Sequence, residues 1–158
     1  MVAGGLLATA PGCGKSKPGA PEVRDVVVER RHFEPVAIPV RLTIPAGMTL
    51  KVPKLSGVLV MVSGQLMPVV AIDMRRPCDA HLKGTACIID LHKPADGTWK
   101  ELADGVVLVE DRATESLYRY DAVTSEVVSC DVSPGLTETL TEARKVCADL
   151  VLRPDGSS

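Results

Sequence analysis

The sequence has few aromatic residues and almost no net charge. Its aromatic side chains are Phe33, Trp99, Tyr118 and Tyr120, which make up 3% of the chain. Proteins that bind single-stranded nucleic acid stack bases on aromatic platforms. A formal net charge of −2 also provides no field that would attract a phosphate backbone. The composition therefore predicts no nucleic-acid partner.

Long apolar runs are missing near the start of the chain. A transmembrane helix needs about 20 apolar residues, and 12 residues precede the first cysteine, Cys13. Thr9–Ser16 is similar to a phosphate-binding Walker A loop, with Thr9 in place of the first glycine. A phosphate loop must be followed directly by a helix. No regular helix can begin in the residues that follow here, Lys17-Pro18-Gly19-Ala20-Pro21. We therefore expect neither a nucleotide partner nor a cofactor.

Recognisable catalytic motifs are also missing. Asp79, His81 and Asp90 are the candidates for an active site, and they would have to gather in a cleft that sequence alone does not show. We therefore predict that the protein is not an enzyme.

Strand patterns dominate the chain from Asp25 onward. In residues 36–44 the apolar side chains recur with a period of two, which is typical of a half-buried strand. Further strands are expected at 26–28, 48–52, 58–62, 66–74, 106–109, 117–123 and 126–132. Hairpin turns are expected at Ser63-Gly64-Gln65 and at Thr124-Ser125. Residues 75–104 are interrupted by proline and glycine, and predict only a short helical turn at 99–103.

The end of the chain predicts an amphipathic helix. Ser133 and Pro134 suit the N-cap and the first helical position. An apolar stripe then covers an arc of roughly 80°, and it consists of Leu136, Leu140, Ala143, Cys147 and Leu150. The expected fold is therefore α+β, an antiparallel sheet with a C-terminal amphipathic helix packed on one face. A strand pair followed by a C-terminal helix is faintly similar to PsbP-like domains, which occur in some bacterial lipoproteins.

Four cysteines follow Cys13, and they allow three disulfide pairings. Proximity in the chain favours Cys78 with Cys87. Helical phase favours Cys130 with Cys147, because Cys147 lies on the apolar stripe and Cys130 shares a strand face with two valines. Such bonds would indicate an oxidising compartment, whereas reduced, buried cysteines would suit the cytosol.

A zinc site is the alternative to the Cys78–Cys87 disulfide in the middle of the chain. Cys78, His81, Cys87 and His92 supply two sulfur and two nitrogen ligands, which suit tetrahedral zinc. The alternative function is then a small zinc-stabilised soluble interaction module. A disulfide between Cys78 and Cys87 would exclude this site.

The residues around Cys13 resemble the end of a bacterial lipoprotein signal peptide. An apolar run ends in small residues at Cys13, and a polar, proline-rich stretch follows. The lipobox, which is the short motif that ends at the lipidated cysteine, is degenerate here: Ala10 replaces the usual leucine three residues before Cys13, and Pro11 is unusual at the next position. The signal peptide is truncated, because no Lys or Arg precedes the apolar run. The resemblance covers about the first 20 residues.

This resemblance implies a domain organisation and a location. Residues 1–12 would be a remnant signal peptide, 13–24 a tether lipidated at Cys13, 25–153 a single domain and 154–158 a disordered tail. The protein would be anchored through acyl chains to a membrane of the cell envelope, facing the periplasm. It would have a non-catalytic binding or structural role, with another envelope protein as a possible partner.

Overall fold

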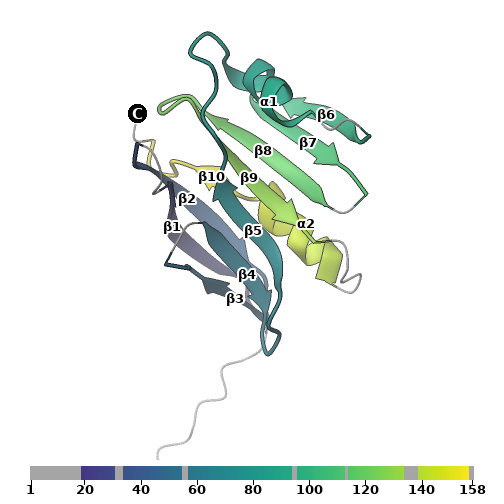
Figure 1. The fold of residues 1–158 in the computed structure, drawn as a ribbon. Coiled ribbons are helices and arrows are strands. Elements are labelled where there is room, and N and C mark those ends of the chain that lie inside the picture. Colours follow the sequence, from purple (N-terminus) through teal and green to yellow (C-terminus); the bar gives the residue numbers. More distant parts are fainter. Residues whose placement is uncertain are drawn as a thin grey trace, which may run out of the picture.

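A computed structural model of the chain describes residues 19–30, 34–54, 57–93, 96–112, 114–133 and 139–156. Within these ranges the fold consists of two antiparallel sheets, of three and seven strands, and two helices (Figure 1). The fold class predicted from the sequence, α+β with a C-terminal helix, is confirmed. Among the described residues, no helix is long and apolar enough to cross a membrane.

The smaller sheet has the order β1-β2-β10. Its strands are β1 (Glu22–Arg30), β2 (Val36–Ile44) and β10 (Val151–Leu152). The bounds of β2 are those predicted, and its alternate residues Ile38, Val40, Leu42 and Ile44 are buried. By contrast, β1 begins inside the stretch 13–24 that was expected to be tether. This prediction was wrong because exposed, mostly polar residues form the first half of β1, which is held by its full pairing with β2.

The larger sheet has the order β3-β4-β5-β9-β8-β7-β6. Its strands are β3 (Met48–Lys51), β4 (Val58–Val62), β5 (Pro68–Met74), β6 (Thr98–Ala103), β7 (Val106–Glu110), β8 (Glu115–Asp121) and β9 (Glu126–Val132). The hairpins β4–β5 and β8–β9 are antiparallel and turn where the sequence predicted. Because β9 is the middle member of the order, it is buried along nearly its whole length.

Between β5 and β7 the sequence prediction was wrong in two respects. Residues 99–103, expected as a helical turn, lie in β6, an edge strand whose residues are all exposed and which pairs with β7. Because β6 buries neither face, its sequence lacks the alternation that would have revealed it. Helix α1 (Gly84–His92) was not predicted. It buries only Cys87 and Ile88, which leaves little helical periodicity to detect.

Hydrophobic cores lie on both faces of the larger sheet. Residues alternate along β7, so that Val107 and Val109 pack under α1, while Val106 and Leu108 contact the core shared with the smaller sheet. The domain is therefore layered, with α1 on one face of the larger sheet and the smaller sheet with the second helix on the other (Figure 1).

The second helix, α2 (Leu140–Ala148), packs against β9, β5 and β2. Of the predicted apolar stripe, Ala143, Cys147 and Leu150 are buried, and Val146 joins them although it was not predicted. Residues 134–138, which include the predicted positions Pro134 and Leu136, lie outside the described residues.

The chain continues beyond β10 as an ordered turn. The Gly156 amide donates to the carbonyl of Arg153, and the Asp155 carboxylate lies 3.8 Å from the Arg41 guanidinium. The expectation of a disordered tail from residue 154 was therefore wrong for residues 154–156, and residues 157–158 lie outside the described part.

Candidate functional site

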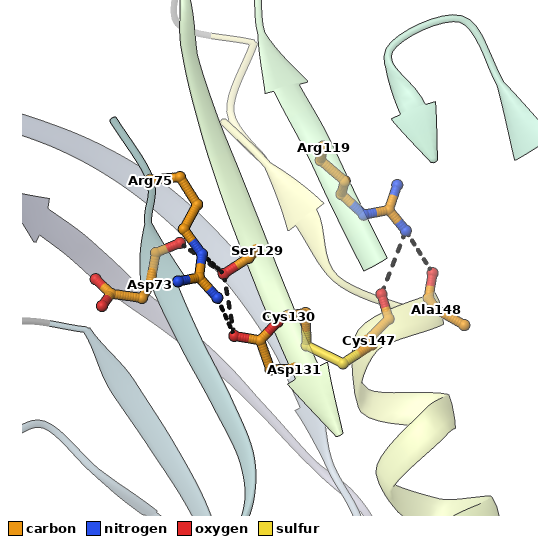
Figure 2. The surroundings of a disulfide bond; sticks show 8 residues. All are labelled: Asp73, Arg75, Arg119, Ser129, Cys130, Asp131, Cys147 and Ala148. Carbon is orange, nitrogen blue, oxygen red and sulfur yellow. Dashed lines mark hydrogen bonds and ion pairs between the residues drawn. A yellow bond between two sulfur atoms is a disulfide. The ribbon is translucent and has the colours of Figure 1, made fainter. Parts of the chain in front are cut away.

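Two disulfide bonds join the four cysteines that follow Cys13. They link Cys78 to Cys87 and Cys130 to Cys147, with Cα–Cα distances of 5.6 and 5.5 Å, and these are the pairs that the sequence favoured. The first bond ties the segment after β5 to helix α1. The second ties α2 to β9, the central strand of the larger sheet (Figure 2).

Helix α2 is held by two further contacts from β8. The Arg119 guanidinium donates to the carbonyl oxygens of Cys147 and Ala148, at 3.3 and 2.9 Å (Figure 2). These carbonyls belong to the end of the helix, where a cation also interacts favourably with the helix dipole. Arg144 on α2 forms an ion pair with Glu115 at 2.8 Å. The helix is therefore fixed to neighbouring strands by covalent, hydrogen-bonding and ionic contacts.

A cluster of polar side chains occupies the opposite face of β9. Arg75 donates to the Ser129 hydroxyl at 3.0 Å and to the Asp131 carboxylate at 2.8 Å. Ser129 is fully buried, and Figure 2 shows Ser129 and Asp131 directed away from the disulfide. We call Arg75, Ser129, Asp131, His92 and Tyr118 the outer polar cluster.

The rings of His92 and Tyr118 form the second half of this cluster. They are stacked, with centroids 4.4 Å apart and planes inclined by 8°. Burial, followed by the positive charges of Arg75 and Arg76, lowers the pKa of His92 to about 4 against the opposing effect of Asp131. Burial also raises the pKa of Tyr118. Both rings are therefore neutral at pH 7.

Two buried atoms of the outer polar cluster have no hydrogen-bond partner within the described residues. They are Nε2 of His92 and Oδ1 of Asp131. A neutral imidazole nitrogen and a carboxylate oxygen are able to bind a small polar group. By contrast, Arg75, Ser129 and Asp131 form hydrogen bonds with one another. The arrangement therefore combines a structural network with a small capacity for polar binding.

The residues considered for zinc do not form a metal site in the described part of the chain. No group of three or more His, Cys, Asp or Glu there is arranged to hold a metal ion. Cys78 and Cys87 are bonded to each other, and His92 stacks on Tyr118. Asp79, His81 and Asp90 are exposed. Cys13, the predicted lipidation site, lies outside the described residues.

Other contacts between the layers were not predicted from the sequence. Arg30 on β1 pairs with Glu126 on β9 at 2.7 Å, and Arg153 forms hydrogen bonds to both carboxylate oxygens of Asp121, at 2.8 and 2.9 Å. The first pair joins the smaller sheet to the larger one, and the second joins the residue after β10 to the end of β8. Arginine and acidic residues so distant in sequence provide no local pattern that would have revealed these contacts.

A pocket of about 360 Å³ lies where the chain enters the domain. Its lining includes Pro21 before β1, Pro45 and Ala46 after β2, and Lys145 of α2. This end of the molecule therefore combines the chain entry with an indented surface.

Comparison with family models, with curated proteins and with solved structures finds no match in any of the three. The resemblance of the Cys13 region to lipoprotein signal peptides, and the fainter one to PsbP-like domains, therefore stay predictions from the sequence.

Proposed function

We propose that the protein is a lipid-anchored domain of the bacterial cell envelope with a non-catalytic binding or structural role. The sequence around Cys13 carries this proposal. The cysteine pairing supports it, because the two disulfides use Cys78, Cys87, Cys130 and Cys147 and leave Cys13 as the odd cysteine. Disulfides persist in oxidising compartments such as the periplasm and are rare in the cytosol.

Acylation of Cys13 would hold the domain close to the membrane. Each buried CH₂ group of an acyl chain contributes about 0.8 kcal/mol, so two or more chains give stable anchoring. Glu22, the first residue of β1, follows Cys13 by nine positions. A fully extended chain of that length spans at most about 30 Å. The anchor therefore limits the distance between the membrane and the start of β1.

The test replaces Cys13 in the full chain, expressed in a bacterium that processes lipoproteins. We expect the wild type in the membrane fraction, with mass spectrometry showing acyl chains on Cys13. Cys13→Ala should move to the soluble fraction, whereas the control Ser16→Ala, in the same tether, should stay with the membrane. Anchoring through Cys13 is wrong if the Cys13→Ala protein remains in the membrane fraction to the same extent as the wild type.

A further inference from the structure

The most exposed apolar side chains of the described residues lie next to each other. They are Leu66 and Met67, with 93% and 71% of their surface exposed, in the turn between β4 and β5. Exposed apolar residues are common singly. Here two neighbours project from one hairpin, and we call Leu66 and Met67 the apolar tip.

The apolar tip lies at the end of the domain where the chain enters. Glu22 pairs with Ile44, so the start of β1 lies beside the end of β2. The turn after β2 lies in turn beside the β4–β5 turn, because the Ser63 amide donates to the Gly47 carbonyl at 2.9 Å. Figure 1 shows the β4–β5 turn at the lower end of the molecule.

Hydrogen bonds hold the two turns in shape. The Gln65 amide donates to the Val62 carbonyl at 3.0 Å, and Gly64 between them has φ 85°, which favours glycine. The turn after β2 is closed in the same manner, with Gly47 at φ 80°. The apolar tip is thus presented outward by a defined backbone.

We propose that the apolar tip inserts into the lipid surface to which Cys13 is anchored, and so orients the domain with its β4–β5 end toward the membrane. This inference rests on the proposed function, since the nine-residue interval between Cys13 and Glu22 brings this end close to the bilayer. Leu and Met are apolar enough to enter the acyl boundary of a bilayer, and their transfer from water is favourable.

The experiment places a polarity-sensitive fluorophore on the tip of the lipidated full-length protein. Leu66→Cys is labelled, and Val123→Cys in the β8–β9 turn is the matched control because it is also exposed, at 50%. The antiparallel pairing of β5 with β9 places that turn at the opposite end of the domain. Each protein is reconstituted into vesicles of phosphatidylethanolamine and phosphatidylglycerol, with a quencher in the lipid or in the water.

We expect the emission of the label at position 66 to shift to shorter wavelength in the vesicle-bound protein, relative to the same protein without its acyl chains in buffer, because a probe that enters the interface leaves water. The lipid-resident quencher should suppress it, and the label at position 123 should respond only to the aqueous quencher. Replacing Met67 with Asp should abolish the shift at position 66 while the protein stays in the vesicle fraction.

Three other outcomes overturn the inference, and they are distinguishable. Equal access of the aqueous quencher to both positions, in a protein that remains vesicle-bound, refutes insertion while anchoring stands. If the label at position 66 is protected from the aqueous quencher in native membranes but not in vesicles of pure lipid, the apolar tip contacts a protein partner instead of lipid. Absence of acylation on wild-type Cys13 refutes the proposed function together with this inference.

Discussion

The disulfide between Cys130 and Cys147 should contribute a large share of the stability of the domain. The two residues are 17 positions apart, and for a loop of this length the chain-entropy relation gives about 3.1 kcal/mol. Both side chains are nearly fully buried. Replacing both with alanine should therefore remove about a further 1 kcal/mol of packing. Total stabilities of domains are typically about 5–15 kcal/mol.

The assay compares unfolding of one background variant, oxidised and reduced, with unfolding of the same variant after both remaining cysteines are replaced. The background carries Cys13→Ala, Cys78→Ala and Cys87→Ala, so that a reductant acts only on the remaining bond. Reduction should lower the free energy of unfolding by about 3 kcal/mol, and adding Cys130→Ala and Cys147→Ala should lower it by about 4 kcal/mol. At about 4 °C per kcal/mol for a domain of this size, the melting temperature should fall by roughly 12 to 16 °C.

Local effects of the same bond should appear in α2. Hydrogen exchange of the amides in Leu140–Ala148 should accelerate on reduction more than exchange in β4, which is separated from β9 by β5 in the sheet order. A loss of less than about 1 kcal/mol on reduction would refute the entropic argument. Alkylation of Cys130 and Cys147 in an exported, unreduced preparation would show instead that the two thiols pack together without a bond.

Two further predictions concern buried titratable groups. The pKa of His92 is lowered to about 4 by burial and by nearby arginines, so between about pH 4 and 6.5 the unfolded chain binds more protons than the native one. The free energy of unfolding should therefore fall as pH drops through this window; His92→Phe should flatten the curve, and the control His81→Gln, at an exposed position, should leave it unchanged. For Asp121, burial raises the pKa, but hydrogen bonds from Arg153 and Thr124 outweigh it and the net pKa is lowered, so its stabilisation is present above the usual carboxyl pKa and is lost as pH falls below it. Asp121→Asn should cost about 2 kcal/mol at pH 7 by urea unfolding, and an equal cost at pH 2 would contradict the charge-based explanation.

The burial of apolar side chains made most strands predictable from the sequence. The bounds of β2, β4 and β9 were predicted to the residue, because each of them buries apolar side chains against a layer. The helix stripe predicted that Cys147 faces the sheet, and the face shared by Val128 and Val132 predicted the same for Cys130. These are short-range arguments, in which side-chain direction follows directly from position along an element.

Elements that bury little were not predictable in the same way. The strand β6 is exposed along its length, and the first half of β1 is exposed and mostly polar. Their stability derives from backbone hydrogen bonds to a neighbouring strand. Which strand becomes that neighbour depends on the tertiary fold and not on the local sequence. Arg30 and Glu126 illustrate the same limit, because their ion pair joins residues 96 positions apart.

The outer polar cluster was missed for a reason that lies in β9 itself. On a strand with one solvent-exposed face, the polar residues Ser129 and Asp131 would point to solvent. However, β9 is the fourth strand in a sheet of seven, counted from β3, and α1 and Arg75 lie on its second side, so the face that carries Ser129 is buried as well. A polar residue there must find a partner within the protein. Arg75, 54 positions earlier in the chain, provides it. Because the Cys130–Cys147 bond leaves from the opposite face of the same strand, the register of β9 sets the placement of the helix and of the cluster together. A one-residue slip of β9 would exchange the two faces, so the disulfide on one side and the Arg75 contacts on the other specify the same register independently.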